Sequence, residues 1–506
     1  MVGDEGLPST FTADASSPGV SLVRRIANHF RSGIVEGQYR VGARLPTVRH
    51  VAAQVGTTAE TVAAAYRILS EQGLVRARTG IGTVVLPQGG SDSVGGLATP
   101  AAGRVPIVPP LATPSFHETY RRLLHLDRDT ASGGFASYTP ALDLYPREAG
   151  RLLRSALRRD GARLFEMGAA EGDPALRGAV AERLAVGGAA VSSKRVMVTN
   201  GGQEGLALVF RALAGPGDTV VVESPTYLGA LEALATAGVR VVGVPVGPDG
   251  PDPDELASVA TRARARVFYT MPSFQNPTGY TMSLARRRRL LAVARRHDLV
   301  IVEDAAASDL SWGAPPPPSL LVLDREQRVV HVGTFSKSLF SGIRLGFVAA
   351  PEALVEPLLR LKYVTNVHVS LLLQRLGLAF ASDRRMRRHL AWVRPAYRAR
   401  RDAMIEALAR ELNGAASWTQ PEGGFSLWLE LPRGLDAADL FRLAVERGVS
   451  FVPGAVFFPE AVQHHALRLC FSGMAPAQIT RGVGLLGEAL RELSGRGAPA
   501  RGRRRA

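Results

Sequence analysis

The chain has 506 residues, which is more than a single hydrophobic core usually supports, so two or more domains are expected. Its 46% hydrophobic and 21% charged residues exclude general disorder, and a single cysteine, Cys470, excludes an intramolecular disulfide. The chain has only three lysines, Lys194, Lys337 and Lys362, whereas arginine is abundant, and this skew suggests a genome-wide coding bias. The net charge of +16 alone is therefore weak evidence for a nucleic-acid partner.

The first 20 residues contain no apolar core of the kind that a secretion signal requires. Residues 1–19 are rich in Ser, Thr, Gly and acidic side chains and predict a flexible leader. No run of 18 uncharged apolar residues occurs later in the sequence. We therefore expect a cytoplasmic protein that has no membrane partner.

Residues 20–86 carry the pattern of a small helical domain. Apolar residues at three- and four-residue spacing predict a first helix that ends near Gly37. Thr47 is a suitable cap for a short second helix. Thr57 and Glu60 form a capping-box pattern that predicts the start of a longer third helix.

A predicted β-hairpin completes this domain. Its strands are expected at Leu74–Ala77 and Thr83–Leu86, with a turn at residues 79–82. Three helices followed by a hairpin predict a winged helix-turn-helix. Residues 20–86 contain nine arginines and three glutamates, and this local positive charge is what phosphate contacts require.

The rest of the chain predicts a linker, a large α/β domain and a basic tail. Residues 87–134 are rich in Gly, Pro, Ser and Ala without periodicity, which is typical of a linker. In residues 135–490, apolar strand-like runs alternate with helical stretches, which predicts a mostly parallel sheet with a smaller C-terminal subdomain. Residues 491–506 hold six arginines and one glutamate and predict a disordered tail, either solvated or in nonspecific contact with phosphates.

The segment most indicative of chemistry is Gly333-Thr334-Phe335-Ser336-Lys337-Ser338, which follows a buried strand and precedes Arg344. A lysine in this setting suits a Schiff base to pyridoxal phosphate, with Ser336 and Arg344 holding the phosphate by charge-assisted hydrogen bonds. An isolated lysine is more often a solvated surface residue, but lysine is scarce in this chain. Lys337 is therefore the candidate catalytic residue.

Three further segments offer polar groups that this cofactor needs. Gly202 and Gln203 follow a strand and open a helix, so their backbone amides can receive a phosphate. Asp304 ends a strand and can pair with a protonated pyridine nitrogen, or it can be a cap or surface acid. Asn276 lies in an Asn-Pro-Thr-Gly segment and can bind the phenolic oxygen or serve only the turn.

Two more side chains complete the candidate site. Tyr227 can stack on the cofactor ring, with a core aromatic as the alternative. Arg468 lies on a late apolar strand, where an unpaired guanidinium would be costly, so the carboxylate of an effector or substrate is its expected partner. No metal is expected.

Jointly and in this chain order, these segments resemble the fold-type I aminotransferases. The resemblance runs from about Phe135 to about Leu490, through FASYTPALDLYP, EGDPALRGAV, VTNGGQEGL, ESPTYLG, MPSFQNPTG, IVED, GTFSKS, GIRLGF, GGFSLWL and LRLCFS. It implies pyridoxal phosphate as the cofactor. By this resemblance Lys337 binds the aldehyde, Asp304 the pyridine nitrogen and Asn276 the phenolic oxygen. Arg344 binds the phosphate, and Arg468 binds the substrate carboxylate.

Residues 20–86 resemble the winged-helix domain of GntR-type repressors, through SLVRRIANHFRSGI, GARLPTVRHVAAQVG, TTAETVAAAYRILSEQGLV and ARTGIGTVV. In that family the second helix of the motif enters the major groove, and the wing touches the minor groove or phosphates. A helical packing module with solvated arginines is the alternative. The DNA contacts that the resemblance implies are Arg44, Arg49, Thr57, Thr58, Thr61, Arg78, Thr79 and Gly80. Ala59 stands where relatives often have an arginine, so a different base preference is expected.

The fusion of these two domains resembles the MocR subfamily of GntR regulators. It implies a transcriptional regulator of amine, amino-acid or vitamin B6 metabolism that usually forms a head-to-tail homodimer. Two DNA-binding heads in one dimer raise the apparent affinity for an operator. The expected partners are double-stranded operator DNA, a small amine or amino-acid effector, and a second copy of the chain.

Two departures from these relatives bear on turnover. Ala306 lies in the Ala-Ala-Ala segment after Asp304, where relatives usually have a tyrosine, and Met167 stands where they often have another. Each missing hydrogen bond is worth roughly 1 kcal/mol, which weakens cofactor retention without abolishing it. We therefore expect a site used for sensing, with little or no turnover.

The resulting hypothesis is that an effector amine displaces Lys337 from the cofactor and so changes local charge and domain closure. Three alternatives stay open: a working aminotransferase with an accessory DNA-binding domain, a regulator whose ligand is pyridoxal phosphate itself, and a scaffold without cofactor. Repeated turnover would indicate a working aminotransferase. DNA binding that responds to cofactor alone would indicate that pyridoxal phosphate is the ligand, and a colourless protein would indicate a scaffold without cofactor.

Overall fold

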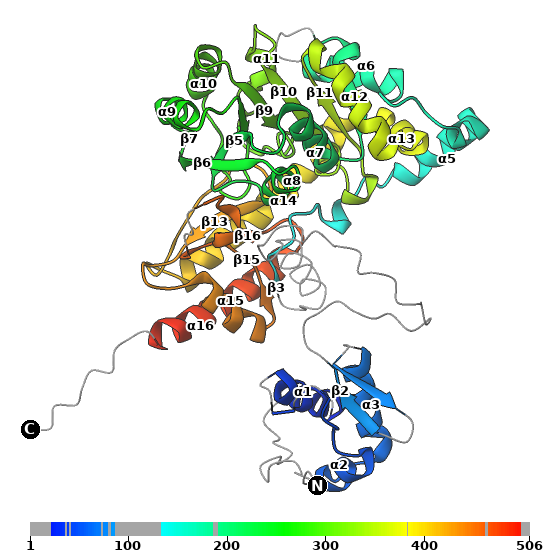
Figure 1. The fold of residues 1–506 in the computed structure, drawn as a ribbon, viewed down its shortest axis with the longest axis vertical. Helices are drawn as coiled ribbons and strands as arrows, with labels where there is room; N and C mark the ends of the chain where they lie inside the picture. The colour runs from blue at the N-terminus through cyan, green and yellow to red at the C-terminus, as the bar shows by residue number, and fades with distance from the viewer. Residues whose placement is uncertain are drawn as a thin grey trace, which may run out of the picture. The chain divides into compact units, whose positions relative to one another are not determined.

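The computed structural model describes residues 22–35, 38–39, 42–71, 74–78, 82–86, 133–185, 191–381, 383–460 and 464–496. The chain divides into two compact units, residues 1–107 and 108–506 (Figure 1). In the described part of the chain, no helix is both long enough and apolar enough to cross a membrane.

The first unit is a winged helix-turn-helix. Its described elements are α1 (Leu22–Val35), α2 (Val48–Val55), α3 (Ala59–Glu71), β1 (Val75–Arg78) and β2 (Gly82–Val85), with β1 and β2 antiparallel. Ile26 and Phe30 on α1 pack with Val62 and Leu69 of α3 in one buried core, because residues three, four and seven apart share a helix face. The predicted order of elements is confirmed.

The third helix begins one residue later than predicted. It starts at Ala59, and Thr58 Oγ1 accepts a hydrogen bond of 3.3 Å from the backbone N–H of Thr61. The predicted capping box of Thr57 with Glu60 is therefore wrong, since Thr58 takes the cap position and satisfies the N–H that a helix leaves unpaired.

The second unit is built on an eight-stranded sheet with the order β4-β11-β10-β9-β8-β5-β6-β7. The strands are β4 (Val196–Thr199), β5 (Thr219–Ser224), β6 (Arg240–Gly247), β7 (Gly250–Pro251), β8 (Val267–Thr270), β9 (Val300–Asp304), β10 (Val329–Thr334) and β11 (Gly346–Ala349). The central strands β10, β9, β8, β5 and β6 are parallel, and β11 pairs antiparallel with both β10 and β4. This confirms a mostly parallel sheet.

Helices cover both faces of the large sheet (Figure 1). Alternate strand residues face opposite layers: Val221 and Ile301 belong to one buried cluster, and Val222 and Val302 to the other. The helices of this part of the unit are α5 (Ala149–Asp160), α6 (Pro174–Ala185), α7 (Gly202–Leu213), α8 (Leu228–Thr236), α9 (Pro253–Ala263), α10 (Leu284–Arg296), α11 (Leu320–Leu323), α12 (Glu352–Asn366) and α13 (Leu371–Ala381). Burial of both faces explains the continuously apolar strands.

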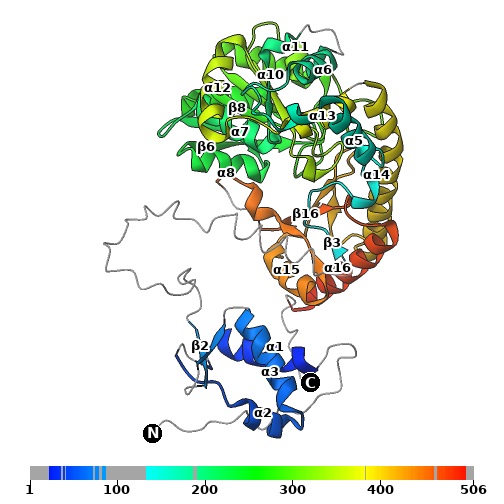
Figure 2. The same cartoon turned by 90° about the vertical axis from the view of Figure 1, so that its right-hand side faces the viewer.

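A smaller subdomain follows, as predicted. It contains α14 (Asp383–Glu411), β12 (Ser417–Trp418), β13 (Ser426–Glu430), α15 (Ala437–Glu446), β14 (Val449–Ser450), β15 (Val452–Pro453), β16 (Ala466–Cys470) and α16 (Pro476–Arg496). Four of the strands form an antiparallel sheet, and β3 (Gly133–Gly134) pairs with β14. Figure 2 shows α14 running along the side of the unit to α16. Helix α16 extends to Arg496, into the segment predicted as tail.

Five strand ends meet at one edge of the large sheet. Strands β5, β8, β9 and β10 are parallel, and β4 shares their direction because β11 is antiparallel to both β4 and β10. The segments that follow these strands therefore leave the sheet on the same side. In open α/β sheets, ligands bind at this carboxyl edge.

Candidate functional site

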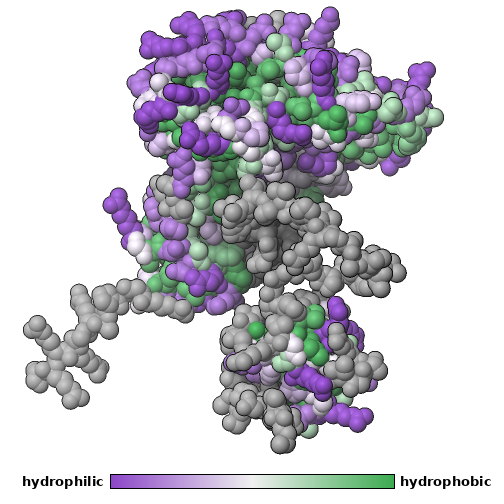
Figure 3. All heavy atoms as spheres, in the orientation of Figure 1, coloured by the Kyte–Doolittle hydropathy of each residue, from purple (hydrophilic) through white to green (hydrophobic). Residues whose placement is uncertain are grey.

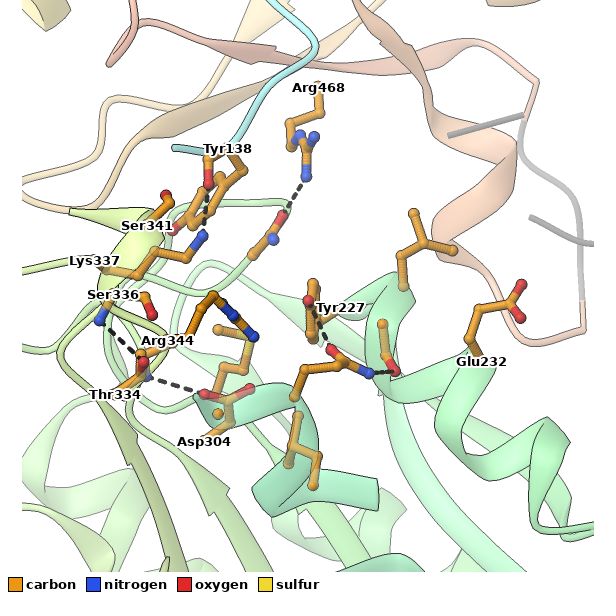
Figure 4. A pocket seen from close by; sticks show the side chains of 18 residues that line it. Tyr138, Tyr227, Glu232, Asp304, Thr334, Ser336, Lys337, Ser341, Arg344 and Arg468 are labelled. Atoms are coloured by element: carbon orange, nitrogen blue, oxygen red, sulfur yellow. Dashed lines mark hydrogen bonds between the residues drawn. The ribbon is translucent and has the colours of Figure 1, made fainter. Parts of the chain in front are cut away.

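A cavity of about 540 Å³ lies at this edge (Figure 4). All nine residues that the sequence analysis proposed for the cofactor and the effector line it: Gly202, Gln203, Tyr227, Asn276, Asp304, Ser336, Lys337, Arg344 and Arg468. They come from the first turn of α7 after β4, from the loops after β5, β8 and β10, from the end of β9, and from β16 of the smaller subdomain. The fold thus brings together residues that are far apart in the sequence.

Lys337 lies in the turn after β10. Its Nζ donates a hydrogen bond of 2.6 Å to the backbone oxygen of Tyr138 and lies 5.1 Å from the centre of the Tyr138 ring. Burial, which disfavours the ammonium form, lowers the pKa of Lys337 to about 8. A substantial fraction of this amine is therefore neutral near physiological pH, as a nucleophile requires.

Asp304 is the last residue of β9 and is buried. Its Oδ2 accepts a hydrogen bond of 2.9 Å from the hydroxyl of Tyr269, and its Oδ1 accepts one of 3.0 Å from the backbone N–H of Ala306. Burial raises the pKa of this carboxyl group, although the two hydrogen bonds oppose the shift. A cationic partner in the cavity would stabilise the ionised form.

One end of the cavity has the features of a phosphate site. Arg344 donates a hydrogen bond of 3.0 Å to the backbone oxygen of Asn200, just before the first turn of α7. The hydroxyl oxygens of Ser336 and Ser341 line the same cavity and are buried without a hydrogen-bond partner among the described residues. Buried hydroxyls are normally paired, so these side chains fit an anionic group with several acceptor oxygens.

Close backbone packing preserves the space for such a group. Gly201 has φ 87°, a value that favours glycine, and a Cβ there would lie 2.8 Å from Arg344 Nη2. A Cβ on Gly346 would lie 2.6 Å from the carbonyl carbon of Gly201. The phosphate end of the cavity therefore depends on two glycines in close backbone contact, Gly201 just after β4 and Gly346 at the start of β11.

The middle of the cavity presents an aromatic ring and an oriented amide. The Tyr227 hydroxyl donates a hydrogen bond of 2.9 Å to Gln203 Oε1, which orients the ring. Asn276 is buried, and its Oδ1 accepts a hydrogen bond of 3.0 Å from Arg468 Nη1. Among the described residues, the Asn276 Nδ2 has no acceptor, so this amide is oriented to donate into the cavity.

Arg468 is buried between the rings of Tyr138 and Phe457, whose centres lie 5.5 and 5.0 Å from its guanidinium carbon. Its Nη2 donates a hydrogen bond of 2.7 Å to the backbone oxygen of Ala136, and its Nε is buried without a partner among the described residues. A buried guanidinium with an unsatisfied donor is suited to an anionic ligand group.

Sequence reasoning missed three contributors to this site. Tyr138 contacts Lys337 through a backbone oxygen, Tyr269 supports Asp304, and Ser341 lines the phosphate end. A backbone contact leaves no residue signature, and Tyr269 has the sequence pattern of a core aromatic within an apolar strand. For Ser341, the only available signal in the sequence was that it is a hydroxyl residue shortly after Lys337.

The two departures in sequence fall in different places. Ala306 lines the cavity beside Asp304, where its small side chain leaves space and its backbone N–H remains a donor. Met167 is 77% exposed and is not among the residues that line the cavity.

In the first unit, the predicted DNA-contacting residues lie at three places. Arg49 is exposed on α2, whose cap is Thr47, and Arg44 is exposed beside β2, where it pairs with Val84. Thr57, Thr58 and Thr61 lie at the start of α3, and Arg78 ends β1. Thr79 and Gly80 lie outside the described residues.

Comparisons with known proteins agree with both halves of this architecture. Residues 22–85 match the gntR family of bacterial regulatory proteins, and residues 141–486 match aminotransferase class I and II. The chain is 39% identical to the 2-aminoadipate transaminase of Thermus thermophilus over 74% of this chain and 94% of that protein. It is 31% identical to the probable rhizopine catabolism regulatory protein MocR of Rhizobium meliloti, over 95% of this chain and 96% of that protein.

A solved structure also matches the second unit. The α-aminoadipate aminotransferase LysN of Thermus thermophilus, complexed with N-(5'-phosphopyridoxyl)-L-leucine, is 36% identical with a TM-score of 0.69. The match covers 75% of this chain and 99% of that chain.

A winged helix-turn-helix joined to a fold-type I aminotransferase domain defines a DNA-binding transcriptional regulator. The relatives that match nearly the whole chain are regulators, whereas the transaminase matches only the second unit. The chain belongs to the MocR subfamily of GntR regulators. The cofactor of this fold is pyridoxal phosphate, and the buried hydroxyls beside Arg344 fit its phosphate group.

Proposed function

We propose that this regulator senses a small amine or amino acid in its pyridoxal-phosphate cavity and that binding there changes its affinity for operator DNA. The observation that carries the proposal is the convergence of all nine predicted site residues, eight of them polar or aromatic, on one cavity in a chain that also has a winged helix. Little or no transamination is expected, since Ala306 adds no side-chain hydrogen bond to the cofactor.

Eight of the residues that line the cavity have a proposed role at the cofactor. Bound pyridoxal phosphate supplies an aldehyde that reacts with amines and a ring that withdraws electrons. Lys337 provides the protein's own amine, and Asp304 holds a negative charge beside the ring nitrogen. Asn276, oriented by Arg468, would donate to the phenolic oxygen, and Tyr227, oriented by Gln203, would stack on the ring. Gly202, Gln203, Ser336 and Arg344 would hold the phosphate.

Arg468 is the proposed recognition group for an effector carboxylate. The guanidinium already donates to Ala136 and Asn276, so the carboxylate would be met by its remaining donors, including the unpaired Nε. An effector that joins an amine to a carboxylate would then occupy the space between Arg468 and Lys337. The effector amine would replace the Lys337 amine on the cofactor aldehyde, and the released Lys337 amine would gain or lose a proton according to its lowered pKa.

We also propose that two copies act together on DNA, in the head-to-tail arrangement that the family resemblance implies. Phe165 and Met167 are large apolar side chains that are 75% and 77% exposed in the single chain. Figure 3 shows apolar surface over α5 and α13, the helices that pack beside this segment. Exposed large apolar side chains that lie together are typical of an interface.

The DNA contacts proposed for each winged helix follow from the family resemblance. Thr57, Thr58 and Thr61 would face bases in the major groove, Arg44 and Arg49 would contact phosphates, and the wing would contribute Arg78, Thr79 and Gly80. The segment 87–134 would join the two functions. A transcriptional regulator must bind chromosomal DNA, so we place the protein in the cytoplasm.

The test uses full-length protein and a DNA duplex selected on it from a random pool. Wild type, Lys337→Ala and Lys194→Ala are loaded with pyridoxal phosphate, and their visible absorbance and DNA affinity are measured while amines and amino acids are added. Lys194 is an exposed lysine in a short 3-10 helix before β4, so Lys194→Ala is the matched control.

Wild type and Lys194→Ala are expected to absorb visible light and to change DNA affinity when an effector is added. Lys337→Ala is expected to keep DNA binding and lose both responses. DNA affinity that ignores cofactor and amines would contradict the proposal. Rapid repeated conversion of an amino donor and a keto acceptor would favour a working aminotransferase instead.

A further inference from the structure

Glu223 is a buried carboxyl group near the cavity that has no role in the proposed cofactor contacts. It lies at the end of β5, one residue before Ser224, and its side chain is inaccessible to solvent. Burial raises its pKa, while four hydrogen bonds to its two oxygens oppose the shift. A buried carboxyl group with this many donors is unusual enough to need an explanation.

The donors to Glu223 come from the neighbouring strand β8 and the loop that follows it. Oε1 accepts hydrogen bonds from the hydroxyls of Thr270 and Tyr280 and from the backbone N–H of Met271 at 3.2 Å. Oε2 accepts one of 3.1 Å from Gln275 Nε2. Glu223 therefore ties the end of β5 to the whole segment that carries Asn276.

Gln275 extends the connection to both cofactor-facing loops. Its Nε2 also donates to the backbone oxygen of Pro225 at 2.8 Å, two residues before Tyr227. Its Oε1 accepts hydrogen bonds from the backbone N–H and the hydroxyl of Thr278 at 2.8 and 2.7 Å. The Gln275 side chain thus holds the turn that contains Asn276 and the strand end that leads to Tyr227.

We propose that Glu223 is a positioning residue, which acts through Gln275 to hold the amide of Asn276 and the ring of Tyr227 in register on the cofactor. The inference rests on the proposed cofactor site and adds a residue that does not touch the cavity. Its physical basis is that Oε1 faces the N–H of Met271 and Oε2 faces the NH₂ group of Gln275, and neither of these groups can accept a hydrogen bond.

Glu223→Gln therefore disturbs these hydrogen bonds while it changes the shape of the side chain very little. Whichever way the new amide is turned, its NH₂ group faces either the Met271 N–H or the Gln275 NH₂. Turning Gln275 over to relieve the second conflict would place its oxygen against Pro225 O and its NH₂ against the Thr278 N–H. The conflict must move the loop that carries Asn276.

The matched control is Glu303→Gln on the adjacent strand β9. Glu303 is equally buried and accepts hydrogen bonds from the backbone N–H groups of Leu320 and Leu321 and contacts His331, but it does not line the cavity. Its substitution disturbs a buried carboxyl network of similar size. General destabilisation would therefore affect both variants.

The experiment measures pyridoxal-phosphate affinity and the pH titration of the visible absorbance band for full-length wild type and both variants. Glu223→Gln is expected to weaken cofactor affinity roughly tenfold and to shift the titration midpoint to higher pH, because Asn276 no longer stabilises an ionised phenolic oxygen. Glu303→Gln is expected to keep the wild-type midpoint. In an Asn276→Ala background, Glu223→Gln should add no further shift.

Tyr280→Phe keeps the test decisive if Glu223→Gln does not fold. It removes one donor from Oε1 without creating a conflict, and a smaller upward shift of the midpoint is expected. Unchanged midpoints, equal shifts in Glu303→Gln, or a full further shift in the Asn276→Ala background would overturn the inference. A wild-type protein that shows no cofactor band would instead overturn the proposed function, and this inference with it.

Discussion

Lys337 Nζ donates a hydrogen bond of 2.6 Å to the backbone oxygen of Tyr138, and the same amine has a pKa lowered to about 8. Tyr138 lies about 60 residues before β4, which is the first strand of the large sheet along the chain. An acceptor oxygen without formal charge can orient an ammonium group without restoring its ordinary pKa. The cavity therefore holds an amine that is both positioned and easily deprotonated.

The rate of cofactor capture should rise with pH and level off above about pH 8, the pKa of Lys337. Only the neutral amine attacks an aldehyde, and burial disfavours the charged form, so the reactive fraction grows as pH increases through the pKa. Stopped-flow absorbance of cofactor-free protein mixed with pyridoxal phosphate would measure it. Lys194→Ala should follow the wild-type profile, and a rate that keeps rising up to the ordinary lysine pKa would contradict the burial argument.

Gly346→Ala should weaken cofactor affinity by at least about tenfold. The added Cβ would lie 2.6 Å from the carbonyl carbon of Gly201, and backbone atoms cannot move aside as the end of a side chain can. The first turn of α7 would shift away from Arg344. Absorbance titration with pyridoxal phosphate measures the loss.

Gly342→Ala is the control for this substitution, because the nearest atom to its Cβ is 4.0 Å away. Its affinity should remain close to wild type. Equal losses in both variants would show that the β10–β11 connection, and not the contact with Gly201, governs the phosphate end of the cavity.

The sequence predicted the site better than it predicted the reasons for its geometry. Asp304, Asn276 and Tyr227 were found because they follow apolar strands, and side chains after parallel strands meet at one sheet edge. Tyr269 was not found, since a tyrosine inside an apolar strand has the pattern of a core residue whether or not its hydroxyl supports a carboxylate. Glu223 begins the ESPTYLG segment, but no sequence pattern shows which donors surround its side chain.

The start of α3 shows the limit of local patterns in the first unit. Thr57 and Thr58 are adjacent hydroxyl residues, so either can cap a helix, and the choice depends on how α2 and α3 pack. Strand β11 likewise depends on its neighbours in the fold. Gly346–Ala349 is short and contains glycine, and it becomes a strand because β4 and β10 lie on either side of it.

Arg49→Ala should weaken binding to any DNA sequence and reduce the salt slope of the binding constant by about 1. Arg49 is exposed on α2, and no described acidic side chain forms an ion pair with it, so its charge is available to a phosphate. Arg360→Ala is the control, since Arg360 is paired with Glu356 on α12 of the second unit. Fluorescence anisotropy at several salt concentrations gives both slopes, and a loss confined to one operator sequence would indicate base recognition instead.

Phe165→Glu combined with Met167→Glu should convert a dimer to a monomer. Both side chains are largely exposed in the single chain, and charges placed there would be buried without partners in an interface. Sedimentation velocity would show the change in mass, and operator affinity should fall with it. Ser258→Glu, on the exposed face of α9, should leave the mass unchanged, and a double variant that remains dimeric would place the interface elsewhere.

Tyr269→Phe should make cofactor affinity fall more steeply as the pH is lowered. The Tyr269 hydroxyl donates to Asp304 Oδ2, and its loss leaves the buried carboxylate with the Ala306 N–H as its remaining described donor, so the pKa of Asp304 rises further. A protonated Asp304 no longer offers a negative charge to the ring nitrogen.

Tyr397→Phe is the matched loss of a buried hydroxyl, because Tyr397 pairs with the backbone N–H of Ala141 and does not line the cavity. It should lower the free energy of unfolding without changing the pH dependence of cofactor affinity. Parallel pH profiles for wild type and Tyr269→Phe would mean that Asp304 stays ionised without the tyrosine. In that case the Ala306 N–H and the bound cofactor are sufficient to hold its charge.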